Sequence, residues 1–229
     1  MGMDLSPLWI SLKTAVTATV VTFFSGVGVA WFVAEYRGRF KGLIDGVLTL
    51  PMVLPPTVVG FFLLVIFGKN GPVGKILLLM GARVIFSWPA TVIAASVVAF
   101  PLMYKTVRGA FEQIDVNIVN AARTLGASEW KIFWRVTIPL AWPGVAAGSV
   151  LAFARALGEF GATLMIAGNI PGKTQTILVA IFFAAEGGEM GKALAWVVLI
   201  FSISLVVMTL MNYWTEYRIK IIPAARTGR

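Results

Sequence analysis

The chain has 229 residues, of which 59% are hydrophobic and 13% are charged, and its formal net charge is +9. A soluble domain would carry about 25% charged residues, so a chain this apolar is expected in lipid rather than in water. It has no cysteine and no histidine, which excludes disulfides and thiolate sites and removes the commonest metal ligand and general base. We therefore expect an all-α integral membrane protein that is not an enzyme and that holds no metal or cofactor.

Five apolar runs are long enough to cross the hydrocarbon as helices, which takes about 20 residues each. The shorter runs at 76–80 and 177–185 cannot cross, and we expect them to dip into the membrane or to lie outside it. Together the spans predict a single transmembrane domain over residues 1–229. In chain order they cover about 8–34, 45–67, 88–104, 139–167 and 193–214.

Prolines interrupt the second predicted span, which contains the segment LTLPMVLPPTVVG. A helix that began only after Pro56 would keep about 11 apolar residues, half of what a crossing requires. Pro51, Pro55 and Pro56 are therefore expected at membrane depth. Two interpretations stay open, a packing kink and a broken helix that borders an aqueous pathway. Under the second, Pro55 and Pro56 are candidate pathway or gate residues.

The connection at about 105–138 is long for a loop, and its pattern predicts a short helix. Asp115 is expected to cap a helix that begins at Val116, and Gly126 is expected to end it. A helix of about ten residues is too short to be stable alone, so it needs a surface to dock on.

A second helix is predicted directly after the first, with Ser128 as its cap. Trp130, Phe133 and Trp134 share one face of this helix, a pattern typical of a helix at the membrane interface. Pro139 is then expected to turn the chain into the fourth span.

Small residues four apart, from Gly144 to Ala156, form one face of the fourth span and predict close helix packing. The same span holds Arg155 and Glu159 one turn apart. They are either a self-satisfied ion pair or a polar element of a translocation pathway. The later segment GNIPGKTQT lacks the glycine spacing of a phosphate-binding loop, so no nucleotide site is expected in this chain.

Basic residues predict the orientation of the spans. Most of the 19 basic residues fall in the loops at 35–44 and 105–138 and in the C-terminal tail. This places those segments in the cytoplasm and the N-terminus outside. The positive charge therefore sets the orientation of the chain in the membrane, and we expect no nucleic-acid partner. The tail contributes Arg218, Lys220, Arg226 and Arg229.

The loop resembles the cytoplasmic coupling loop of the binding-protein-dependent ABC importer permeases. Their pattern is E-A-A, three residues, G, nine residues and I-x-L-P. This chain has Asn120-Ala121-Ala122, then Gly126 and Val136-Thr137-Ile138-Pro139 at the same spacing. Asn120 replaces the glutamate, Val136 the isoleucine and Ile138 the leucine of the pattern. The coupling residues that the resemblance implies are Asn120, Ala121, Ala122, Arg123, Thr124, Leu125, Gly126 and Pro139.

Within that family, the segments LPMVLPPTVVGFFLLVIFGKNGPVG, ARALGEFGAT and NIPGKTQTI are similar to the molybdate permeases. The tungstate and sulfate permeases share much of the loop and the GEFGA segment, so these anions remain alternatives. The resemblance implies a type I ABC importer permease fold in a prokaryotic cytoplasmic (inner) membrane. It also implies a homodimer that binds two ATPase subunits through the short helix. A periplasmic or surface-anchored oxyanion-binding protein would meet the outer face, and transport would proceed by alternating access.

Two other function classes are weighed against this interpretation. A channel or proton-coupled carrier usually has intramembrane carboxylates and inverted repeats, whereas Glu159 is the only deeply placed acid and no repeat is evident. An intramembrane enzyme ranks last because the chain has neither histidine nor cysteine.

Overall fold

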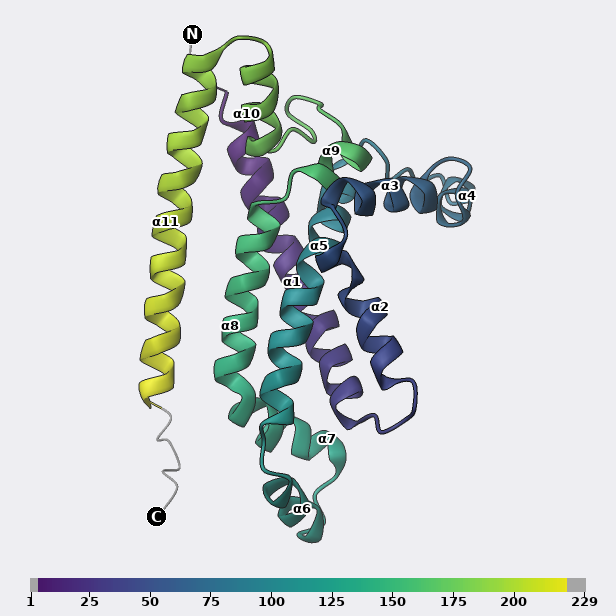
Figure 1. Ribbon diagram of the computed structural model, residues 1–229, viewed down its shortest axis with the longest axis vertical. Helices are drawn as coiled ribbons and strands as arrows, with labels where there is room; N and C mark the ends of the chain where they lie inside the picture. The colour runs from purple at the N-terminus through teal and green to yellow at the C-terminus, as the bar shows by residue number, and fades with distance from the viewer. Residues whose placement is uncertain (1–3, 222–229) are drawn as a thin grey trace.

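The computed structural model describes residues 4–221, and every regular element among them is helical, which confirms the all-α fold (Figure 1). Of the basic tail, Arg226 and Arg229 lie outside the described residues, as do the side chains of Arg218 and Lys220. The elements are α1 (Ser6–Glu35), α2 (Lys41–Val53), α3 (Pro56–Phe67), α4 (Pro72–Leu79), α5 (Trp88–Glu112), α6 (Val116–Thr124), α7 (Glu129–Ile132), the π-helical turn η1 (Phe133–Thr137), α8 (Ile138–Leu157), α9 (Gly161–Ala167), α10 (Ile177–Glu186) and α11 (Met190–Ile221).

Three long helices, α1, α5 and α8, form the core of the bundle (Figure 1). They bury one continuous apolar cluster, in which Val33 and Val145 have no exposed surface. Small residues allow the close approach, since a Cβ on Gly144 would fall 2.3 Å from the Cβ of Ala110 on α5. Gly148 is buried, and a Cβ there would fall 3.1 Å from Sδ of Met103 on α5. The small-residue face of α8 is therefore a packing face, as predicted.

The predicted second span at 45–67 consists of two helices. α2 and α3 meet at an angle of 111°, and α3 lies across the bundle (Figure 1). Pro55 and Pro56 cause the break, because neither has an N–H to donate to the carbonyls of the preceding turn. The helix is therefore broken here, and the aqueous pathway beside the break stays a prediction.

The predicted third span ends too early. α5 continues eight residues past the expected end at 104, to Glu112, so the loop predicted at 105–138 is shorter at its start. Arg108 lies on this added part of the helix, where its charge is paired with Asp45 and Glu112. With α7 beginning at Glu129, the segment between the long helices is 113–128 and contains α6.

The predicted fourth span at 139–167 is also in two parts. α8 ends at Leu157, and α9 begins after a short turn at 158–160. Pro139 does not turn the chain, because a single helical run extends from Glu129 to Leu157. The π-helical turn η1 comes just before this proline, and its extra residue makes room for a ring that would clash with a carbonyl of the previous turn.

The helix α11 runs along one edge of the molecule, against α10 and α8 (Figure 1). The most apolar 18-residue window of its segment Met190–Met211 has a mean hydropathy of 2.6, yet only 6% of that window is buried. Such a surface suits contact with lipid acyl chains. By length and hydropathy, four described helices can cross a membrane, or five if α2 and α3 count as one bent span.

Candidate functional site

The helix α6 projects from one end of the bundle, beyond the ends of α5 and α8 (Figure 1). Both of its ends are closed, as predicted. The Asp115 carboxylate accepts a hydrogen bond of 2.8 Å from the backbone N–H of Asn117. At the other end Gly126 has φ +75°, and the N–H of Ala127 donates to the carbonyl of Ala122 at 3.1 Å. This is the Schellman arrangement, which satisfies carbonyls that the end of a helix otherwise leaves free.

No residue of α6 is buried. Leu125, which follows it, is 88% exposed, and Val116 and Ile118 are also exposed. A nine-residue helix is marginal by itself, and clustered apolar side chains at the tip of a molecule indicate a contact surface. Seven of the predicted coupling residues, 120–126, lie together on this protruding element. The eighth, Pro139, lies in the first turn of α8.

Arg123 connects α6 to its neighbours. Its guanidinium donates to both carboxylate oxygens of Glu129, at 2.7 and 3.0 Å, and to the side-chain oxygen of Asn120 at 3.2 Å. It also lies 3.9 Å from the carboxylate of Glu35 at the end of α1. The hydrogen bonds from Arg123 hold the pKa of the Glu129 carboxyl below its usual value. The roles of Glu129 and Glu35 were not predicted, although an arginine and a glutamate on either side of a glycine turn are a usable signal.

The aromatic face predicted on the second helix is divided between the core and the surface. Phe133 is 6% exposed and packs on Trp31, with ring centroids 4.9 Å apart. Trp130 and Trp134 are 66% and 51% exposed, with ring centroids 5.6 Å apart. Ser128 caps the helix through the N–H of Lys131, as predicted. Phe133 thus anchors the segment α7–η1, which links α6 to α8, to the core, and the two indoles remain on the surface.

The two helix breaks meet, although they are about 100 residues apart in the chain. A Cβ on Gly161 would fall 3.2 Å from Cβ of Pro56, and a Cβ on Gly60 would fall 2.7 Å from Cα of Ala162. The first turn of α3 therefore packs directly against the first turn of α9. This contact places the break at Pro55 and Pro56 next to the turn at 158–160. The predicted pathway residues Arg155 and Glu159 lie just before this turn and within it.

Glu159 is 3% exposed, and each of its two carboxylate oxygens contacts another group of the protein. Oε1 accepts a 2.8 Å hydrogen bond from the N–H of Ala162 and so caps α9. Oε2 lies 2.9 Å from Arg155, an ion pair without the alignment of a hydrogen bond. The self-satisfied pair is therefore present, and capping is a role that sequence reasoning missed. Because Arg155 is paired, it does not offer an uncompensated positive charge.

A second polar network joins α2 to α5 near the α6 end of the bundle. The Tyr104 hydroxyl donates to Asp45 at 3.0 Å, and Arg108 pairs with Asp45 and, at 2.9 Å, with Glu112. Lys41 lies 3.2 Å from the same glutamate. No residue of α2 is fully buried, although Ile44 and Leu48 pack against the core, and this network adds polar contacts that hold α2 to α5. Sequence reasoning missed it, because its members are far apart in the chain. Among residues 4–221, no cluster of three or more acidic side chains could hold a metal ion.

The family profile described as "Binding-protein-dependent transport system inner membrane component" matches residues 26–219. The chain belongs to this family. Its relatives include the putative molybdenum transport system permease protein YvgM of Bacillus subtilis (strain 168), 47% identical over 204 residues, which cover 89% of this chain and 90% of YvgM. The molybdenum transport system permease protein ModB of Escherichia coli (strain K12) is 44% identical over 205 residues, 88% of each chain. A probable sulfate transport system permease protein, cysT of Chlorokybus atmophyticus, is 35% identical over 204 residues, 89% of this chain and 71% of cysT.

The solved structures of ABC transporters confirm the fold of this family member. A bacterial ABC transporter that imports the acidic polysaccharide alginate aligns with a TM-score of 0.79 at 17% identity, covering 94% of this chain and 80% of that one. The inward-facing MetNI methionine ABC transporter aligns with a TM-score of 0.69 at 16% identity, covering 94% of each chain. The protein is therefore the inner membrane component of a binding-protein-dependent transport system, with the fold of ABC importer permeases.

Proposed function

We propose that this chain is the transmembrane subunit of an ATP-driven importer that moves molybdate into the cell. It works as a homodimer, two ATPase subunits dock on α6, and a binding protein delivers the anion at the opposite end. The observation that carries the proposal is α6 itself, a helix capped at both ends and unburied at the tip of the bundle. The choice of molybdate rests on the relatives named as molybdenum permeases, which are 40–47% identical to this chain.

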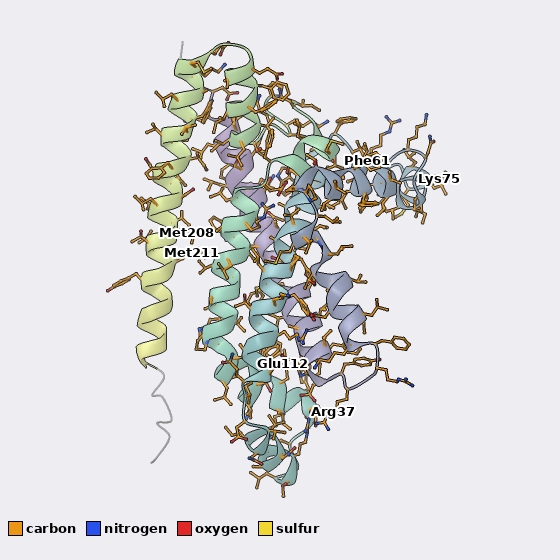
Figure 2. The ribbon with its side chains drawn as sticks, viewed as in Figure 1. Arg37, Phe61, Lys75, Glu112, Met208 and Met211 are labelled. Atoms are coloured by element: carbon orange, nitrogen blue, oxygen red, sulfur yellow. The ribbon has the colours of Figure 1, made fainter. Side chains whose placement is uncertain are left out.

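The orientation puts α6 and the C-terminus in the cytoplasm and the N-terminus outside. Arg37, in the basic loop after α1, lies at the same end of the molecule as Glu112, near α6 (Figure 2). Clustered arginine and lysine residues favour the cytoplasmic side of a membrane. The exposed indoles Trp130 and Trp134 then meet lipid headgroups on that side.

Transport of an oxyanion needs a polar route, because the cost of moving a multiply charged ion into hydrocarbon is prohibitive. The route lies between two copies of the chain, since four or five spans are few to enclose a pore. ATP hydrolysis by the partner subunits moves α6. The segment α7–η1, which Phe133 anchors to the core, transmits this motion to α1, α5 and α8. The adjoining breaks at Pro56 and Gly161 are the places where the bundle bends. The chain binds no ATP and catalyses no covalent step.

The proposal is tested by co-purifying the ATPase subunits with wild-type protein and with Gly126→Asp, and by measuring uptake of radiolabelled molybdate. We expect the wild type to retain the ATPases and the variant to lose them together with uptake. Retention of the ATPases by Gly126→Asp would contradict the role of α6. Competition by sulfate and tungstate tests the anion, and the relative named for sulfate makes that ion the second candidate. Uptake driven by a proton gradient without ATP would indicate a carrier instead.

A further inference from the structure

Exposed positive charges gather around α3 and α4 and the nearby connectors, in the half of the molecule away from α6 (Figure 1). Four cations are exposed there, in the turn after α3, on α4, before α5 and between α9 and α10. No Asp or Glu occurs between Asp45 and Glu112, nor between Glu159 and Glu186. Figure 2 shows Lys75, on α4, far from Glu112 at the other end of the bundle. The four are Lys69, Lys75, Arg83 and Lys173.

These cations are unpaired, unlike many others in the chain. Among the described residues, none of the four is in an ion pair, whereas arginines at the other end, such as Arg108 and Arg123, are paired with carboxylates. A group of like charges held together without counter-charges repels itself. A complementary surface on another molecule would relieve this repulsion.

Three of the four cations surround one cavity. Lys69, Arg83 and Lys173 line a hollow of about 880 Å³ between α3, α4 and the connectors at 81–87 and 168–176. Its other walls are mainly apolar, with Leu77 and Ile85 among them. The hollow is far larger than one tetrahedral oxyanion, and apolar walls do not replace the water around such an ion. Its size and its charged rim with an apolar interior fit an inserted loop of protein.

We propose that this basic cavity, defined by Lys69, Arg83 and Lys173, receives an acidic surface loop of the binding protein. The inference rests on the proposed function, because it names the contact by which the delivering protein meets this permease. The helices α3 and α4, which line the cavity, lie in the half of the molecule away from α6, on the side where such a protein must dock (Figure 1). Rim charges of this kind steer encounter, so their removal slows association and raises the concentration of binding protein that is needed, most strongly at low salt.

The test uses the assembled permease–ATPase complex in nanodiscs of zwitterionic lipid. The readout is ATPase activity stimulated by the molybdate-loaded binding protein of the same transport system. Lys69→Glu, Arg83→Glu and Lys173→Glu are each expected to raise the half-maximal concentration of binding protein by about 3–10-fold, and the triple variant by about 30-fold or more. The corresponding Gln variants should show smaller effects. The differences should shrink in 1 M salt, where the Debye length is about 3 Å.

Lys192→Glu is the matched control, because this lysine is exposed at the start of α11, away from the cavity, and pairs only with the exposed Glu189. It should leave the half-maximal concentration unchanged, and ATPase activity without binding protein should be unchanged in every variant. If the triple variant responds like wild type, this inference is overturned while the proposed function stands. If wild type itself is never stimulated by binding protein, the proposed function fails. If the variants change only when anionic lipid is present, the cavity binds a lipid headgroup and the inference is wrong.

Discussion

The ending of α6 at Gly126 allows a prediction with a magnitude. Gly126 has φ +75°, and a Cβ added there would meet nothing within 4 Å. Gly126→Ala therefore adds no clash, and its cost is that of a side chain in the left-handed region, about 1–2 kcal/mol. Because α6 has no buried residue, no packing offsets this cost. The folded fraction of an isolated α6 falls by a factor of roughly 5–30 for such a change.

The assay is the affinity of the purified ATPase subunits for the permease in nanodiscs. If docking requires folded α6, the dissociation constant rises by up to the same factor of about 5–30. Gly126→Asn should weaken binding less, since asparagine tolerates this conformation. Gly28→Ala in the middle of α1 is the control, because its added Cβ also meets nothing and its φ is not positive. Wild-type affinity in Gly126→Ala, or an equal loss in Gly28→Ala, would refute this reasoning.

Three further predictions follow from the same geometry. Asp115→Ala removes the first cap of α6 and should cost about 1 kcal/mol, seen as weaker ATPase binding that Asp115→Asn largely restores. Glu159→Gln keeps an oxygen to cap α9 but breaks the pair with Arg155, so it should lower the melting temperature less than Glu159→Ala; equal losses would show that the cap contributes nothing. Asp45→Asn leaves Arg108 with a weaker partner and should destabilise the protein by more than Tyr104→Phe, which removes one hydrogen bond worth about 1 kcal/mol; the reverse order of melting temperatures would contradict the role given to this network.

The local structure of the coupling segment could be predicted from the sequence, because its determinants are adjacent in the chain. Asp115 and Gly126 are the residue types that begin and end helices, and nothing distant competes with them. The small-residue face of α8 was predictable for a similar reason, since a four-residue repeat already defines a helix face.

The breaks were only partly predictable. Pro55 and Pro56 predict an interruption of the helix, but they do not predict the angle of 111° between α2 and α3. The break at 158–160 was missed because Gly158 continues a row of small residues, with Ala154 and Ala162 four positions to either side. A new helix starts here because the Glu159 carboxylate accepts a hydrogen bond from the first turn of α9.

Contacts between distant segments could not be derived from composition or periodicity. Asp45 and Arg108 are 63 residues apart. By residue type alone, neither can be told from any other charged residue at the membrane surface. The helix α5 continues past its predicted end because the prediction followed the end of the apolar run, whereas lysine and arginine are good helix formers. Charge type is visible in a sequence, but the partner of a charge is a property of the fold.

The account depends most on α6 being the surface through which the ATPases act, and one measurement tests this directly. The chain has no cysteine, so Leu125→Cys, at an 88% exposed position, gives a single reporter thiol. We predict that a membrane-impermeant maleimide labels this thiol in inside-out vesicles but not in intact cells, and that added ATPase subunits protect it. Labelling in intact cells, or no protection by the ATPase subunits, would contradict the account.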